Sequence, residues 1–318
     1  MTALTKVTET AKVNVEYFSD TTIDAFIASR HGSPNTAKTY RNSIRQMLKY
    51  FNAKSITAPT TADVDNFING LRGAKKSDST IRLYSTITKM FFSYLGKRGI
   101  YRDVAADCAP LKLRKSSTHK KKSLTDAQAR KLLAAVKGSS LIARRDKAII
   151  ALCLTCGLRT IEVARADVKD FYQGSDCYYL DVQGKGRIQK DSTVKVAMPV
   201  AELILSYLEL RGTLSSDAPL FASTSNNNSK YGNRYSEQSV GKMIKRTLKS
   251  VGIDDKKITA HSTRHYAATT AIKAGIDIRE VGAMLRHSSI VVTSVYLHDL
   301  SVQTRRAELA VADALFCA

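Results

Sequence analysis

A basic stretch divides this chain into two parts that must fold separately. Residues 106–123 contain a proline and then the run LKLRKSSTHKKKS, which has too few apolar residues to enter a core. Helical apolar spacing resumes on both sides. The chain therefore predicts a helical domain over 19–105, a basic linker over 106–123 and a larger domain over 124–300. Residues 1–18 are polar and rich in threonine, which is typical of a flexible arm.

Four amphipathic helices are expected in the first domain. In the second of them Ile44 and Met47 belong to an apolar face, whereas Lys38, Arg41 and Arg45 lie off it. A bundle with one basic side results, although an ordinary solvated face would look the same. The predicted helices cover residues 21–30, 35–51, 62–72 and 78–99.

The second domain is expected to be mainly helical with a small antiparallel β-sheet. A capping box, Thr125-x-x-Gln128, begins a helix that runs to Gly138. An apolar helix over 141–156 is central and ends at Gly157. Two strand-like runs form a hairpin around a mobile loop. The strands are 177–183 and 192–199, the loop is 184–191, and further helices are expected near 201–211, 236–251, 261–274, 277–286 and 289–297.

The charge favours a polyanionic partner. Lysine and arginine number 50 against 28 acidic residues, a net charge of +22, and nucleic acid is the first candidate. No apolar run is long enough to span a bilayer and no signal peptide is evident, so a cytoplasmic, nucleoid-associated protein is expected. Five scattered cysteines indicate reduced thiols. The pair Cys153-x-x-Cys156 lies in an apolar run and is expected to pack in the core rather than bind zinc.

Several separated polar residues suit a phosphodiester. His261 and Arg264 lie three apart, so a helix would place both on one face. Tyrosine, whose reference pKa is about 10, is a weak nucleophile unless cations or a base assist it. Taken singly, each residue reads as a surface cation or a structural side chain. The ordered set is Arg159, Lys185, His261, Arg264, His287 and Tyr296, with Glu162 one turn after Arg159.

This set resembles the signature of the tyrosine recombinase (phage integrase) family, over residues 123–302. The resemblance implies a core-binding domain followed by a catalytic domain. It further implies that Tyr296 attacks the scissile phosphate and becomes joined to the DNA 3′ end. Arg159, Arg264 and His287 would then stabilise the transition state, Lys185 would protonate the leaving 5′ oxygen, and His261 would assist proton movement. Glu162 would hold Arg159 or His261, and no metal, nucleotide or other cofactor is required.

The resemblance also implies partners. Double-stranded DNA recombination sites would be held by a homotetramer on two sites, with an accessory DNA-bending or directionality protein as a possible addition. The Ala- and Leu-rich segment 301–318 would form a helix that either packs against its own domain or, as the resemblance implies, is exchanged between subunits. Expected DNA contacts beyond the catalytic set are Lys38, Arg41, Arg45, Lys112, Arg114, Lys120, Lys121, Lys122, Lys230 and Arg234.

Two other functions stay open on sequence grounds. A type IB topoisomerase uses a similar residue set without a synaptic partner, and a relaxation assay on unrelated plasmid DNA would separate the two. A DNA-binding protein with a vestigial motif would form no covalent adduct. The sequence does not reveal the target DNA, nor whether the reaction serves integration, excision, inversion or resolution.

Overall fold

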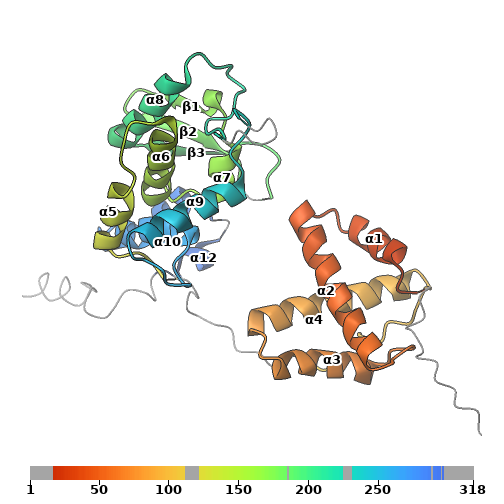
Figure 1. Ribbon diagram of the computed structural model, residues 1–318. Coiled ribbons are helices and arrows are strands. Elements are labelled where there is room, and N and C mark those ends of the chain that lie inside the picture. The colour runs from red at the N-terminus through yellow and green to blue at the C-terminus, as the bar shows by residue number, and fades with distance from the viewer. Residues whose placement is uncertain are drawn as a thin grey trace, which may run out of the picture. The chain divides into compact units, whose positions relative to one another are not determined.

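The chain divides into two compact units, residues 1–115 and 116–318, each of which is described here by itself. The structure, a computed structural model, describes residues 17–111, 122–184, 186–224, 231–287, 289–294 and 296. Both units are mainly helical, and the second also contains a small antiparallel sheet (Figure 1). The predicted fold class is confirmed.

Four helices form the N-terminal unit, and a serine or threonine caps the first turn of each. Ser19, Ser33, Thr60 and Ser77 each accept a hydrogen bond from the backbone amide three residues ahead, which replaces partners that a helix start lacks. The helices are α1 (Asp20–Ala28), α2 (Pro34–Ala53), α3 (Thr61–Gly73) and α4 (Asp78–Lys97).

The core of this unit is aromatic and extends slightly beyond the predicted domain bounds. Phe26 and Phe91 meet edge to face with ring centroids 5.2 Å apart. Phe18, placed by the sequence in the N-terminal arm, is buried in this core, and so is Cys108, placed in the linker. The rest of the predicted arm and residues 112–121 of the predicted linker lie outside the described residues.

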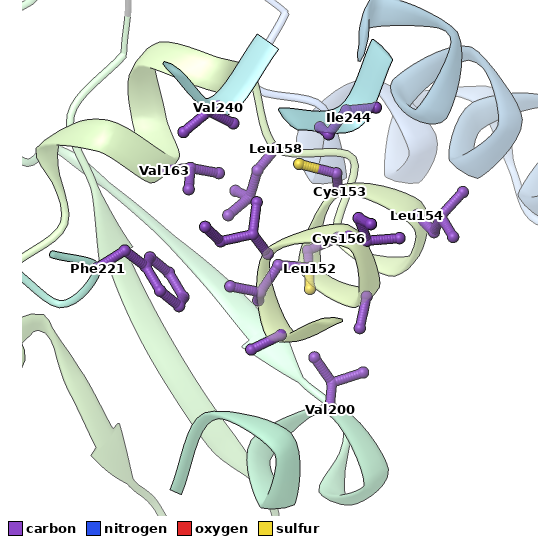
Figure 2. Close-up of a cluster of buried hydrophobic side chains, with 14 of the residues drawn as sticks. Leu152, Cys153, Leu154, Cys156, Leu158, Val163, Val200, Phe221, Val240 and Ile244 are labelled. Atoms are coloured by element: carbon purple, nitrogen blue, oxygen red, sulfur yellow. The ribbon is translucent and has the colours of Figure 1, made fainter. Parts of the chain in front are cut away.

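The C-terminal unit surrounds the apolar helix α6 (Leu141–Thr155). This helix packs against α5 (Asp126–Ala134), α8 (Met198–Arg211), α9 (Glu237–Ser250) and α10 (Ala260–Lys273). Figure 2 shows Leu152, Cys153 and Cys156 within the buried cluster. Burial raises the pKa of the Cys153 thiol to about 12, so it stays protonated. The expected core role of the cysteine pair is confirmed.

The remaining elements complete the C-terminal unit. They are α7 (Thr160–Arg165), the 3-10 helix η1 (Val168–Asp170), β1 (Phe171–Gln173), β2 (Tyr178–Val182), β3 (Ser192–Val196), α11 (Ile278–Met284) and α12 (Ile290–Ser294). In the sheet, ordered β1-β2-β3, Leu180 pairs with Val194, and both side chains are buried. The hairpin expected from the sequence is confirmed.

Three local predictions are wrong. Helix α5 ends at Ala134 rather than Gly138, because the apolar Val136 packs against the core outside the helix. Strand β3 ends at Val196, and residues 198–199 instead begin α8, whose first turn tolerates Pro199. Strand β1 was not predicted, since three residues are too few to show alternation.

Candidate active site

One buried carboxylate organises the site. Glu162 on α7 is fully buried, and its Oε1 lies 2.7 Å from Nη1 of Arg159, which immediately precedes the helix. Its Oε2 accepts the Arg159 backbone amide at 2.8 Å and Nη2 of Arg286 at 2.7 Å. Burial alone would raise the pKa of Glu162, but the charge and hydrogen bonds of Arg286 and Arg159 outweigh it and hold the pKa below its ordinary value. Glu162 is therefore ionised at neutral pH.

Arg264 is the most deeply buried cation of this site. Its guanidinium donates to the carbonyl of Gly157 at 2.6 Å and to that of Leu285, and its Nη1 lies 4.0 Å from Oε2 of Glu162. Burial, together with the like charges of Arg159 and Arg286, lowers the pKa of Arg264 to about 9. That value still leaves it protonated at neutral pH. Helix α10 and the Gly157 turn thus fix a cation beside α7.

His287 and Tyr296 lie face to face. Their ring planes differ by 3° and their centroids are 6.2 Å apart. Nδ1 of His287 lies 2.8 Å from Oγ1 of the buried Thr293 on α12. Burial and the charges of Arg264, Arg159 and Arg286 lower the pKa of His287 to about 4, so the ring is neutral at pH 7. The hydrogen bond between Nδ1 and the Thr293 hydroxyl fixes the orientation of the ring.

Tyr296 is held in its own subunit's core. Its side chain is only 2 % exposed and packs with Ala268, Val281 and Leu285. The ring of His265 meets it edge-on at 5.1 Å between centroids, and His261 meets His265 at 4.9 Å. His265 is fully buried and lies between the two rings. His261 is exposed and contacts the ring of His265, which in turn contacts Tyr296.

Two clefts meet at Arg159. One, of about 590 Å³, is lined by Arg159, Arg187, Arg286 and His287. The other, of about 520 Å³, is lined by Arg159, His261 and Lys245. In the first cleft Arg187 pairs with Asp191 and Arg286 pairs with Glu162, which leaves donors of Arg159 and His287 for a phosphodiester. His261 and His287 line different clefts, so they would approach such a group from different sides.

Lys185 lies outside the described residues, but the ends of its loop are firmly attached. Arg165 donates to the carbonyl of Gly184 at 3.0 Å, and Gln183 donates to the carbonyl of Ile188 at 2.9 Å. Nζ of Lys190 lies 2.5 Å from Oδ2 of Asp167 and also bonds Asp170. The β2–β3 loop is thus tied to α7 and η1 on both sides of Lys185.

Some of the candidate DNA-contact residues already form ion pairs within the protein, whereas Lys38 on α2 is exposed. Arg45 lies 3.1 Å from Asp20, and Arg41 pairs with Asp24. Arg234 pairs with Asp167 and donates to two backbone carbonyls, and Lys122 lies 2.9 Å from Asp255. The candidates Lys112, Arg114, Lys120, Lys121 and Lys230, and the segment 301–318, lie outside the described residues.

Sequence reasoning missed two residues of the site. Arg286 was assigned no role, because a basic residue at the end of a predicted helix is usually a solvated cation that favours the helix dipole. Thr293 gave no signal, since its contact with His287 depends on the turn between α11 and α12. Within the described ranges, no group of three or more His, Cys, Asp or Glu side chains could hold a metal ion. No helix described here has both the length and the apolar character needed to cross a bilayer.

Family models match most of the chain. The model described as "Phage integrase family" matches residues 122–302, and "Phage integrase, N-terminal SAM-like domain" matches residues 20–101. A relative from Bifidobacterium longum, "Tyrosine recombinase XerD", is 30 % identical over 83 % of this chain and 86 % of its own. "Tyrosine recombinase XerC" of Alcanivorax borkumensis is 28 % identical over 87 % and 89 %.

Solved structures share the fold. The XerH recombinase bound to its palindromic difH substrate, in a post-cleavage complex, aligns with a TM-score of 0.70 and 20 % identity, covering 91 % of this chain and 82 % of that one. A dimer of lambda integrase bound to a COC′ core site aligns with a TM-score of 0.65 and 18 % identity, covering 86 % and 96 %. At these identities the likeness concerns architecture.

Proposed function

We propose a catalytic mechanism from the premise that this chain belongs to the phage integrase family of tyrosine recombinases, which cut and rejoin DNA at specific sites. Tyr296 is proposed to be the nucleophile. The observation that supports this best is its position: its ring stacks on His287, beside the cluster of Arg159, Arg264 and Glu162. No other tyrosine in the described residues is placed in this way.

Each cation has a distinct proposed task. Arg159, whose side chain is a quarter exposed, keeps donors for the non-bridging oxygens while Glu162 fixes its orientation. Arg264 is buried, and its Nε has no hydrogen-bond partner among the described residues. A phosphate oxygen at that nitrogen would satisfy it and gain a donor in the transition state, where negative charge increases.

His287 is proposed to donate as a neutral ring. For this the Thr293 hydroxyl must donate to Nδ1, which leaves Nε2–H as the free donor. Lys185 on the tethered β2–β3 loop is proposed to protonate the departing 5′ oxygen, and His261 to assist proton movement. The covalent 3′-phosphotyrosyl bond conserves the energy of the cleaved bond, so the reverse attack rejoins the strand.

Trapping of the covalent intermediate tests the nucleophile. The probe is a set of duplexes assembled from the DNA that flanks the gene, each nicked so that cleavage releases a short fragment and cannot reverse. The unaltered protein should form an adduct that survives denaturing electrophoresis. Tyr296→Phe should bind the same duplexes but form no adduct. An adduct of equal yield with Tyr296→Phe would contradict the assignment.

The proposed assembly is a tetramer on two DNA sites. The tail 301–318 is proposed to occupy a groove of about 440 Å³ on a neighbouring subunit, lined by Ile276, Val281 and Met284. Two features support this: the Ala- and Leu-rich composition of the tail, and the exposed side chains of Val291 and Val292 on α12. An accessory DNA-bending or directionality protein, and association with the nucleoid, belong to the same proposal.

A further inference from the structure

Arg286 occupies a backbone conformation that normally requires glycine. Helix α11 ends in a Schellman motif, in which the His287 amide bonds the Gly282 carbonyl and the Arg286 amide bonds the Ala283 carbonyl, at 3.0 and 2.9 Å. Arg286 is the residue after the helix cap, and its φ is +55°. A side chain there costs conformational energy, because its Cβ crowds the following carbonyl.

Positive φ alone does not single out this residue. His31, Ser55 and Lys75 also have positive φ near helix ends, but all three are exposed. Arg286 differs because its side chain is only 7 % exposed and ends against a buried carboxylate. The strained backbone therefore delivers a buried cation, which glycine could not supply.

The guanidinium of Arg286 grips Glu162 as a fork. Nη2 lies 2.7 Å from Oε2 and Nε lies 3.4 Å from Oε1, while Nη1 donates to the carbonyl of Met284 at 2.6 Å. Arg159 binds the same carboxylate from the other side. Without Arg286, a fully buried Glu162 would lose its strongest stabilising charge. Arg159 would then be held by a carboxyl group whose orientation is no longer fixed from the other side.

We propose that Arg286 is a positioning residue of the recombination reaction, which holds Glu162 in place for Arg159 and fixes the turn that carries His287. This rests on the proposed function, since it assigns Arg159 and His287 to the phosphate. Arg286 acts through these two residues. It belongs to the same site, and its guanidinium bonds Glu162 and the Met284 carbonyl.

The charges around the site predict that loss of Arg286 changes the pH dependence of cleavage. Glu162 faces Arg159, Arg264, Arg286 and the Cys153 thiol, and His287 faces three arginines and His261. Loss of one positive charge raises the pKa of both Glu162 and His287. Both then take up a proton at higher pH, which disables the ion pair and removes the neutral ring. The acid limb of the cleavage rate should therefore move to higher pH.

The key variant is Arg286→Gly, which relieves the positive φ and removes the guanidinium. On the nicked duplexes, we expect it to bind DNA within about twofold of the unaltered protein and to cleave about 10- to 100-fold more slowly at pH 7. Its acid limb should lie about one pH unit higher. Arg286→Lys keeps the charge without the fork and should recover part of the rate. Ser55→Gly, which relieves a similar φ on the exposed surface, should cleave normally.

A double-mutant cycle separates positioning from general stability. If Arg286 acts through Glu162, then Glu162→Gln should add little to the defect of Arg286→Gly. Cleavage by Arg286→Gly at the normal rate with an unshifted pH profile would overturn the proposal. Fully additive rate defects of Arg286→Gly and Glu162→Gln would also overturn it. So would a lowered melting temperature of Arg286→Gly together with a normal cleavage rate at temperatures where that variant is fully folded. If the unaltered protein itself formed no adduct, the proposed function would fail instead.

Discussion

The charge of His287 links the site to pH. The unfolded chain takes up a proton on this histidine near pH 6.5, whereas the folded chain does so only near pH 4. Between these values the unfolded state binds more protons, so stability contributed by the neutral ring is present above pH 6.5 and is lost as the pH falls towards 4. Acid should therefore weaken the fold before carboxylates such as Glu162 begin to titrate.

This gives a stability prediction at the residue scale. The melting temperature of the unaltered protein should fall between pH 7 and pH 5, and that of His287→Gln should fall less. The free energy of unfolding of the unaltered protein should fall by about 1 kcal/mol more than that of the variant, after allowance for solvent that reaches the half-buried ring. Scanning calorimetry at the two pH values measures it. Equal losses in both proteins would show that His287 is not kept neutral by its surroundings.

Site residues whose contacts lie within one helical turn could be predicted from the sequence. Residues whose contacts depend on how separate helices pack could not. Arg159 and Glu162 lie one helical turn apart, so their ion pair could be expected from sequence. Arg286 could not be assigned, because nothing local shows that a turn with positive φ directs its side chain inward. Thr293 is six residues from His287, a spacing with no meaning until α11 and α12 are folded against each other.

Among the elements, the four N-terminal helices were predicted to within two residues at each end. Their caps and apolar spacing are local signals and agree with each other. In the C-terminal unit the deviations arise where tertiary packing decides, as at the end of α5 and the start of α8. Local sequence therefore predicts well the elements that contain their own start and stop signals.

The ion pairs that hold the β2–β3 hairpin loop can be tested by mutation. Lys190→Met removes the cation that binds Asp167 and Asp170, which leaves two carboxylates close together and frees one end of the loop. We expect about tenfold slower cleavage of the nicked duplexes with nearly unchanged DNA binding, since the loop must still place Lys185.

Lys195→Met is the matched control. Lys195 lies on β3 of the same hairpin and pairs with Asp176 at 3.0 Å, but both side chains are more than half exposed. Such a pair contributes little to stability, so cleavage should stay within about twofold. Equal defects in the two variants would show that net charge, and not the tether, is what matters.

At the scale of the whole molecule, the charge of +22 predicts salt-sensitive DNA binding. Lys38 is exposed, whereas Arg45 already pairs with Asp20. Lys38→Ala should lower the slope of log affinity against log salt by about one if Lys38 meets a phosphate. Arg45→Ala should lower it less, because its pairing with Asp20 competes. Fluorescence anisotropy over a salt series gives both slopes, and an unchanged slope for Lys38→Ala would remove it from the interface.

The proposed exchange of residues 301–318 between subunits can be tested by truncation. A protein that lacks residues 302–318 should bind one site normally and still form the Tyr296 adduct, because the described site lies within residues 157–296. It should fail to complete strand exchange between two sites, which requires neighbouring subunits. Sedimentation of the DNA complex and a plasmid recombination assay measure these steps. Full recombination by the shortened protein would refute the role of the tail.

The 2 % exposure of Tyr296 has a consequence for copies of the enzyme that hold no DNA. Small electrophiles in solution, such as nitrating reagents, should react slowly with a phenol that is packed against aliphatic side chains and two histidine rings. In molecules that hold no DNA, the proposed nucleophile is therefore protected from chemical modification.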